Sequence, residues 1–187
     1  MKTGKILCRF AARDGREVIL RTPRWEDLDD FMDFINSLVE EGADICRNEK
    51  VTREEEAEWL GGRLADLEND KVFLMVAEVD GRVVANSQIG RKGGYSNHVG
   101  GLGIGIRKGY RDIGIGTEML KALITKAEEM GLKMLTLGVF SSNDSAMHLY
   151  NKVGFRETGR FPKEIYKDGR YIDHIIMTKE IQQMSNS

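Results

Sequence analysis

The chain has few of the residues that build disulfide scaffolds or metal sites. Of its 187 residues, two are cysteine and three are histidine. Cys8 and Cys46 cannot form a multi-bridge framework, and neither belongs to a C-x-x-C pair, so we expect two reduced thiols. The histidines, His98, His148 and His174, lie far apart without ligand-like spacing. No metal site is predicted.

The chain also lacks strong net charge and long apolar runs. A formal net charge of −2 gives no field that would hold nucleic acid through its phosphates. No apolar run approaches the roughly 18 residues of a membrane span. The first ten residues lack the apolar core of a signal peptide. We therefore expect a cytoplasmic protein without a nucleic-acid or membrane partner.

The composition that remains is that of an ordinary folded domain. Hydrophobic residues make up 41% and charged residues 31% of the chain. A length of 187 residues suits one domain. We predict a single domain over residues 1–187, with a core over about residues 18–181 and a loose tail over residues 182–187.

Three Asp-Gly pairs, beginning at residues 14, 80 and 168, each predict a β-hairpin. The middle pair joins Val72–Val79 to Arg82–Ile89, and both runs are rich in strand-forming residues. The last pair joins Glu164–Lys167 to Tyr171–Thr178. These hairpins make much of the expected sheet antiparallel.

Two helices are expected between the first and the second hairpin. Thr22 can cap the first helix with Pro23 at its first position, and apolar residues then recur at helical spacing as far as Val39. The second helix opens with a capping box, Thr52 and Glu55, followed by a leucine-rich stripe.

The second half of the chain alternates strands and helices. The expected elements are a strand over His98–Ile106, a helix over about Thr117–Met130 ended by Gly131, a strand over Met134–Phe140 and a short helix over about Asp144–Val153. A strand-helix-strand unit gives parallel neighbours. The order β-α-α-β-β-β-α-β-α-β-β predicts an α/β fold with a mixed sheet and helices on both faces.

The stretch over residues 102–117, LGIGIRKGYRDIGIGT, is typical of an anion site. Gly114 and Gly116 stand where a strand gives way to a helix, so several backbone N–H groups can point at one anion. A helix dipole adds about 0.3 to 1 kcal/mol per exposed phosphate charge, and a diphosphate fits this arrangement best. A dinucleotide fold would need a third glycine where Met119 stands.

A second segment, NDSAMHLYNKVGF over residues 143–155, makes this signal specific. Together with the turn over residues 111–116, it resembles the N-acetyltransferase superfamily abbreviated GNAT. The fingerprint of that family is an Arg/Gln-x-x-Gly-x-Gly/Ala turn and a downstream Asn…Ala…Leu-Tyr…Gly-Phe helix. The resemblance extends over about Val18 to Ile181. It implies a mixed, mostly antiparallel sheet with splayed central strands and helices on both faces.

The resemblance implies an enzyme that transfers an acetyl group from acetyl-CoA to a primary amine by direct attack. The pantetheine arm of the cofactor would lie along the strand end formed by Ile104, Gly105 and Ile106, bonding its backbone as an added strand would. The diphosphate would sit on the N–H groups of the turn. The implied turn residues are Arg111, Asp112, Ile113, Gly114, Ile115, Gly116 and Thr117.

The resemblance also implies two catalytic residues. Tyr150 matches the usual general acid of the family, which returns a proton to the leaving thiolate. Asn143 is placed to hydrogen-bond the cofactor or the acceptor, a role compatible with capping the helix that follows. The oxyanion of the tetrahedral intermediate would be held by a strand N–H, that of Ile104 or a neighbour. The structural alternative for Tyr150 is an aromatic that only packs.

The general base departs from the family pattern. Many members carry a glutamate on the strand before the turn, but residues 98–103 contain no carboxylate and Gly101 stands at that place. His98, Glu78 acting through water, or water itself stay open as the base. A non-catalytic acyl-CoA-binding sensor with the same fold is the alternative to an enzyme, and the retained Tyr150 argues against it.

The resemblance implies an amine acceptor, and the sequence leaves open whether it is a protein N terminus, a lysine or a small amine. A lysine amine with a pKa of about 10.4 is neutral in roughly one molecule per thousand at pH 7.4, which costs about 4 kcal/mol, whereas an α-amine near 7.7 to 8.0 costs under about 1 kcal/mol. Without a strong base, amines of low pKa are favoured. Four acidic residues in the loop from Glu40 to Val51 could attract a cationic acceptor or form a solvated cluster. The sequence leaves open whether the chain forms a homodimer.

Overall fold

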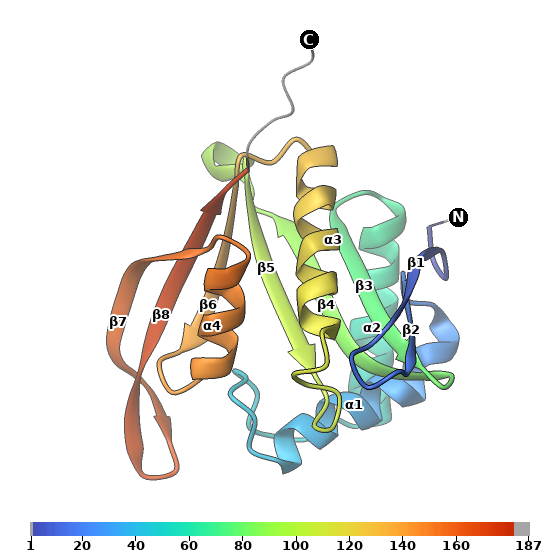
Figure 1. The fold of residues 1–187 in the computed structure, drawn as a ribbon, viewed down its shortest axis with the longest axis horizontal. Helices are drawn as coiled ribbons and strands as arrows, with labels where there is room; N and C mark the ends of the chain where they lie inside the picture. Colours follow the sequence, from blue (N-terminus) through green and yellow to red (C-terminus); the bar gives the residue numbers. More distant parts are fainter. Residues whose placement is uncertain (1, 182–187) are drawn as a thin grey trace. The chain divides into compact units, whose positions relative to one another are not determined.

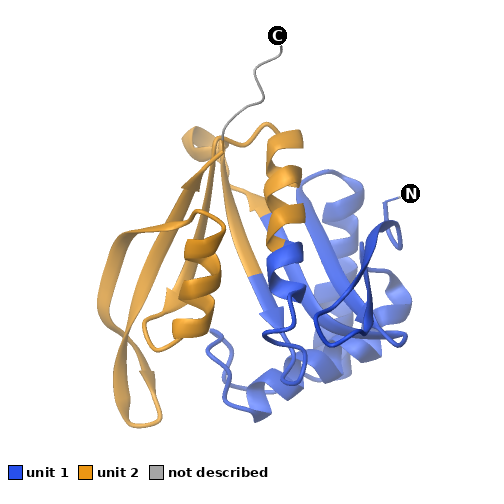
Figure 2. Ribbon diagram, viewed as in Figure 1, with its two compact units in different colours: residues 1–89, 104–119 blue, residues 90–103, 120–187 orange. Residues whose placement is uncertain are grey.

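The computed structural model describes residues 2–181, so the expected tail over residues 182–187 lies outside the described residues. The chain forms two compact units (Figure 2). The first unit holds the described residues up to Ile89 together with Ile104–Met119, and the second holds Gly90–Gly103 and the described residues from Leu120 onward. A single domain over the whole chain stays a prediction.

The first unit contains the N-terminal hairpin, the two following helices and the strands after them (Figure 1). Its elements are β1 (Ile6–Ala11), β2 (Glu17–Arg21), the 3-10 helix η1 (Trp25–Asp27), α1 (Leu28–Glu40), α2 (Arg53–Glu68) and β3 (Val72–Val79). It also holds most of β4 (Arg82–Arg91), the end of β5 (Val99–Ile106) and the start of α3 (Ile115–Glu129).

The second unit holds the remainder of β4, β5 and α3 and all later elements. Those are the 3-10 helix η2 (Gly94–Ser96), which precedes β5, and then β6 (Met134–Phe140), α4 (Asp144–Lys152), β7 (Arg156–Lys167) and β8 (Arg170–Glu180).

The strands follow one another in the sheet as β1-β2-β3-β4-β5-β6-β8-β7. The pairs β1/β2, β2/β3, β6/β8 and β7/β8 are antiparallel, and β5/β6 is parallel. The predicted α/β fold with a mixed, mostly antiparallel sheet is confirmed. The predicted element order counted one strand before the first helix, whereas both arms of the first hairpin form strands.

The parallel ladder of the second unit is short. It contains three pairs, from Val99/Met134 to Gly101/Thr136, and both strands continue beyond it. β6 instead keeps its antiparallel pairing with β8 up to Phe140, opposite His174. The splay expected between the central strands therefore begins within this unit, directly after Gly101.

Apolar residues at helical spacing make the core of the first unit. Leu28 and Phe31 of α1 pack with Leu60 of α2 and with Val76 and Val83 of the sheet, and all five are buried. Burial of such a side chain contributes roughly 1.5 to 3 kcal/mol. Packing against the sheet thus fixes α1 and α2, and α1 lies beside the strand end considered below.

The start of the first helix differs from the prediction. α1 begins at Leu28 after η1, so Thr22 is not its cap. The Thr22 hydroxyl instead accepts the Lys5 N–H at 2.8 Å, because the N-terminal segment lies beside it. Asp27 takes the capping role at η1 and accepts the Arg24 N–H at 2.9 Å.

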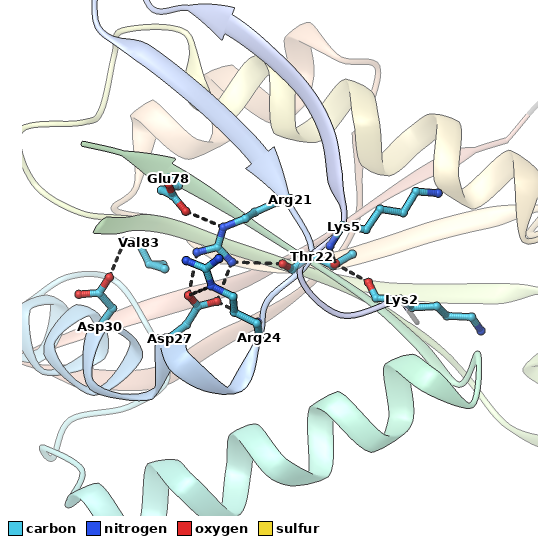
Figure 3. A network of polar contacts seen from close by, with 9 residues as sticks. All are labelled: Lys2, Lys5, Arg21, Thr22, Arg24, Asp27, Asp30, Glu78 and Val83. Carbon is cyan, nitrogen blue, oxygen red and sulfur yellow. Dashed lines mark hydrogen bonds and ion pairs between the residues drawn. The ribbon is translucent and has the colours of Figure 1, made fainter. Parts of the chain in front are cut away.

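A buried ion network joins β2, η1 and β3 (Figure 3). Arg21, only 3% exposed, donates to both carboxylate oxygens of Asp27 at 2.7 Å and to Glu78 Oε2 at 2.6 Å. Burial opposes the charge, but these hydrogen bonds raise the pKa of Arg21 above its ordinary value. Loss of one member of the network would leave an uncompensated buried charge and would therefore destabilise the fold.

Several predicted helix ends are confirmed. The Thr52 side chain accepts the Glu55 N–H at 3.2 Å and Glu55 accepts the Thr52 N–H at 2.8 Å, which is the expected capping box. α3 ends at Glu129, and Gly131 follows in the left-handed region with a φ of 68°.

The last hairpin is longer than predicted. β7 begins at Arg156, and its register with β8 shifts between Phe161 and Ile165. This bulge breaks the alternation by which a strand is recognised, so the sequence indicated only Glu164–Lys167. The Asp168-Gly169 turn is confirmed, with φ angles of 50° and 74°.

Candidate active site

The strand end predicted to hold pantetheine lies in the first unit. Ile104, Gly105 and Ile106 form the last residues of β5, and all three are half-buried. A Cβ on Gly105 would meet Phe34 at 3.3 Å and Leu38 at 3.4 Å. Glycine therefore lets α1 approach the strand closely.

The turn predicted to bind a diphosphate is also in the first unit. Asp112 and Gly114 adopt φ angles of 61° and 99°, in the left-handed region. The Ile113 carbonyl accepts the Arg13 N–H at 2.9 Å, which ties the turn to the first hairpin. This strained backbone turns the chain from the strand into the helix.

The helix after the turn begins earlier than predicted. α3 starts at Ile115 rather than at about Thr117, so Gly116 and Thr117 belong to its first turn. The earliest intrahelical bond runs from the Glu118 N–H to the Gly114 carbonyl at 3.2 Å. Helix geometry therefore leaves the N–H groups of residues 115–117 without intrahelical partners, which is the arrangement that binds phosphate.

The side chain of Arg111 braces this turn. Its Nε donates to the Ile106 carbonyl at 2.8 Å, and its guanidinium forms an ion pair with Glu41. Glu40 pairs with Lys50 at 2.5 Å. Two of the four acidic loop residues are thus neutralised within the chain and supply little attraction for a cationic acceptor.

The second unit contains the two predicted catalytic residues. Asn143 Oδ1 accepts the Ala146 N–H at 3.0 Å and caps α4. Tyr150 is 6% exposed, with its ring 6.0 Å from that of Phe155. Burial raises the pKa of Tyr150 to about 12, so the phenol keeps its proton throughout the physiological range.

The residues considered for the general base have different surroundings in the structure. The Glu78 carboxylate is held by Arg21, so Glu78 is engaged in the ion network. His98 is exposed next to the start of β5, and its carbonyl accepts the Lys133 N–H at 2.8 Å. A Cβ at Gly101 would meet only the Gly90 carbonyl oxygen, at an ordinary 3.8 Å. Packing therefore does not explain the missing carboxylate.

Sequence reasoning missed one ionisable pair. His174 Nδ1 lies 2.5 Å from Glu164 Oε2, across the final hairpin. The spacing of His174 from the other histidines argues only against a metal site, and the bulge that brings Glu164 to His174 is not encoded in local spacing. The available signal was that both residues fall in the two arms of one predicted hairpin.

The described residues, 2–181, contain neither a candidate metal site nor a candidate membrane span. No group of three or more His, Cys, Asp or Glu side chains in that part could hold a metal ion. No helix among the same residues is long and apolar enough to cross a membrane.

Comparison with known proteins identifies the family. The model of the acetyltransferase (GNAT) family matches residues 32–155. The putative phosphinothricin acetyltransferase YwnH of Bacillus subtilis is 26% identical over 166 residues, covering 87% of this chain and 98% of that protein. An N-alpha-acetyltransferase of Sulfurisphaera tokodaii is 33% identical over 115 residues, covering 55% of this chain and 67% of that protein.

A solved structure agrees with these sequence matches. The ribosomal-protein-alanine N-acetyltransferase of Brucella melitensis superposes with a TM-score of 0.76 and 28% identity. The superposition covers 86% of this chain and 98% of that one.

Proposed function

The chain belongs to the acetyltransferase (GNAT) family, and we propose that it transfers an acetyl group from acetyl-CoA to an α-amine of a protein or peptide, or to a small amine of low pKa. The family makes the protein an acyl-CoA-dependent N-acetyltransferase. The observation that carries the proposal is the left-handed turn at Gly114, directly before the first turn of α3, whose N–H groups have no intrahelical partners.

The turn and strand end would hold the cofactor. The N–H groups of residues 115–117 suit the diphosphate, and the helix dipole adds up to about 2 kcal/mol when the site is partly buried. The backbone of Ile104 to Ile106 would bond the pantetheine arm. In the second unit, Asn143 uses Oδ1 as a cap, so Nδ2 is the group of this side chain that would donate to the cofactor or acceptor.

The chemistry would be direct attack. The amine attacks the thioester carbonyl, a C–N bond forms, the C–S bond breaks with its electron pair on sulfur, and the nitrogen releases one proton to water. Tyr150 would protonate that sulfur, and its buried phenol is fully protonated at working pH because its pKa is raised to about 12. A strand N–H, that of Ile104 or a neighbour, would hold the oxyanion.

The acceptor follows from the missing carboxylate. Gly101 stands where many family members carry a glutamate, and the Glu78 carboxylate is hydrogen-bonded to Arg21. A lysine amine would then cost about 4 kcal/mol for deprotonation at pH 7.4, against under about 1 kcal/mol for an α-amine. The names of two relatives, an N-alpha-acetyltransferase and a ribosomal-protein-alanine N-acetyltransferase, support an α-amine.

An amine panel tests this proposal. Thiol release from acetyl-CoA and product mass would be measured at pH 7.4 with four acceptors: peptides with a free N terminus, the same peptides blocked at the N terminus but carrying lysine, a polyamine, and phosphinothricin. We expect the free α-amines or phosphinothricin to react at least about tenfold faster than lysine or polyamine. Faster lysine or polyamine acetylation would refute the acceptor assignment.

The same assay separates the enzyme from a sensor. The absence of a carboxylate at Gly101 is the observation that favours a non-catalytic acyl-CoA-binding protein. Tight acetyl-CoA binding in calorimetry, without thiol release for any amine, would establish the sensor and exclude the enzyme.

A further inference from the structure

The loop of the first hairpin lies against the turn that precedes α3 (Figure 1). The Arg13 N–H donates to the Ile113 carbonyl at 2.9 Å. At the other end of the turn, Arg16 Nη2 donates to the Gly109 carbonyl at 2.8 Å, and the Arg16 guanidinium carbon lies 4.4 Å from the centroid of the Tyr110 ring. Both segments belong to the first unit. The hairpin loop is therefore fixed to both ends of the turn.

The backbone of the hairpin loop is also closed by its own hydrogen bonds. The Ala12 N–H donates to the Arg16 carbonyl at 2.8 Å, and the Gly15 N–H donates to the Ala12 carbonyl at 2.9 Å. Gly15 has a φ of 88°, which glycine adopts without steric cost. Since Arg13 lies between these residues in the chain, its backbone is held in place beside the turn.

The stem of the Arg13 side chain lies beside Gly114. A Cβ on Gly114 would stand 3.9 Å from Arg13 Cγ. Gly114 directly precedes residues 115–117, whose N–H groups have no intrahelical partners. Beyond Cγ, an arginine side chain extends by roughly 4 to 5 Å at ordinary bond lengths. The guanidinium of Arg13 can therefore reach an anion that is bound to those N–H groups.

The Arg13 guanidinium carries a charge that its neighbours do not neutralise. Arg13 is exposed, and in the part of the chain that the structure describes no hydrogen bond or ion pair engages its guanidinium. The other two arginines at this turn are paired: Arg16 with Asp14 at 2.5 Å, and Arg111 with Glu41. Of these three arginines, Arg13 is the one available to an incoming anion.

We propose that Arg13 binds the cofactor, its guanidinium pairing with the diphosphate of acetyl-CoA at the N–H groups of residues 115–117. The inference rests on the proposed position of the diphosphate at this turn. The two kinds of donor complement each other, because each N–H binds one oxygen while the guanidinium fork can bind two oxygens of one phosphate. Arg13 thus favours a thioester that carries the diphosphate over one that lacks it.

Coenzyme A has a second phosphate group, the 3′-phosphate of its ribose, with the same chemistry. The contact with Gly114 favours the diphosphate, because Gly114 is bonded to the first of the N–H groups proposed to hold it. Acetyl-dephospho-CoA, which keeps the diphosphate and lacks the 3′-phosphate, distinguishes the two groups.

Arg13→Gln tests the proposal, because it removes the charge and keeps the backbone N–H that donates to Ile113. We expect calorimetry to show acetyl-CoA binding about tenfold weaker, the effect of one charge some 6 Å from a phosphate at an effective dielectric constant of about 40. Acetyl-dephospho-CoA should lose affinity by the same factor. S-acetylpantetheine, which has no phosphate, should bind to the variant as it binds to wild type.

Three further measurements separate a phosphate contact from a structural effect. KM for acetyl-CoA should rise about tenfold at unchanged kcat, because the lost contact is the same in the ground state and the transition state. At 1 M salt, where the Debye length is about 3 Å, the deficit in affinity should shrink to about twofold or less. Arg13→Lys keeps the charge without the fork, so its affinity should lie between those of wild type and Arg13→Gln.

The matched control is Arg9→Gln, which removes the same charge from β1 of the same hairpin. Arg9 is exposed and pairs with Glu17 at 3.1 Å. Four residues, roughly 10 Å or more of chain, separate Arg9 from Arg13, which exceeds the Debye length of about 8 Å in physiological salt. Acetyl-CoA affinity of the control should therefore stay within about twofold of wild type. An equal loss in both variants would trace the effect to net charge and overturn the proposal.

The remaining outcomes separate Arg13 from the proposed site. Unchanged acetyl-CoA affinity in Arg13→Gln would overturn the role of Arg13, and so would a loss seen with acetyl-CoA but not with acetyl-dephospho-CoA. Gly116→Asp reports on the turn itself. If that variant binds acetyl-CoA as wild type does, the diphosphate does not lie at this turn and the proposed site fails. If Gly116→Asp weakens binding and Arg13→Gln does not, the role of Arg13 alone is contradicted.

Discussion

Replacing Tyr150 by phenylalanine removes one oxygen and leaves the ring in place. The ring is 6% exposed and packs 6.0 Å from Phe155, contacts that phenylalanine keeps. If the phenol protonates the leaving sulfur, kcat should fall by about 10²- to 10⁴-fold, or about 3 to 5 kcal/mol of barrier. The dissociation constant of acetyl-CoA should stay the same, because the proposed cofactor contacts lie on the strand end and turn.

The raised pKa of Tyr150 adds a pH signature. At about 12, this pKa leaves the phenol protonated well beyond pH 10, where an ordinary tyrosine is half ionised. Ionisation of the acid should therefore produce no alkaline limb in kcat below about pH 10. A limb that appears near pH 9 in wild type and vanishes in Tyr150→Phe would show that the burial argument is wrong.

Stability at alkaline pH reports on the same group. The folded-state pKa of Tyr150, about 12, lies above the ordinary unfolded value of about 10, so its contribution is complete below pH 10 and is lost as pH rises to 12. A difference of about two pH units corresponds to roughly 3 kcal/mol. Urea unfolding should show that Tyr150→Phe loses less free energy of unfolding between pH 10 and 12 than wild type loses.

The assay combines thiol release with calorimetry on both proteins. Tyr150→Phe with kcat within about threefold of wild type would refute the general-acid role. A variant that loses cofactor affinity as much as kcat would show instead that the hydroxyl binds the cofactor.

Two further substitutions test the predicted diphosphate-binding turn and the ion network of Arg21. Gly116→Asp should weaken acetyl-CoA binding about tenfold or more in calorimetry. The reason is that a negative charge some 6 Å from a phosphate, at an effective dielectric constant of about 40, costs roughly 1.4 kcal/mol. S-acetylpantetheine, which lacks the diphosphate, should bind to the variant as it binds to wild type. Arg21→Met leaves the buried Asp27 and the half-buried Glu78 without this partner and should lower the free energy of unfolding by about 3 to 5 kcal/mol in urea. The control Arg9→Met removes an exposed ion pair and should cost at most about 1 kcal/mol.

Features set by neighbouring residues were readable from the sequence. The Asp80-Gly81 turn adopts φ angles of 50° and 77° because those residue types tolerate the left-handed region, whatever the rest of the chain does. Asn143 caps α4 through a bond that spans three residues. The acid role of Tyr150 and the diphosphate role of the turn came from the family resemblance, and both stay predictions.

Features set by distant residues were not readable. The Thr22 hydroxyl is taken up by a segment 17 residues away, which moves the start of the first helix. Arg111 is braced by Glu41, 70 residues earlier in the chain. The His174–Glu164 contact needs a bulge whose backbone is held by Asp173. Each depends on tertiary contacts that no local spacing encodes.

The crystal structure of the protein with acetyl-CoA bound tests the central claim most directly. We predict diphosphate oxygens within hydrogen-bonding distance of the N–H groups of residues 115–117, and the thioester sulfur within reach of the Tyr150 hydroxyl. A cofactor whose diphosphate binds elsewhere, or whose sulfur lies far from Tyr150, would contradict the account.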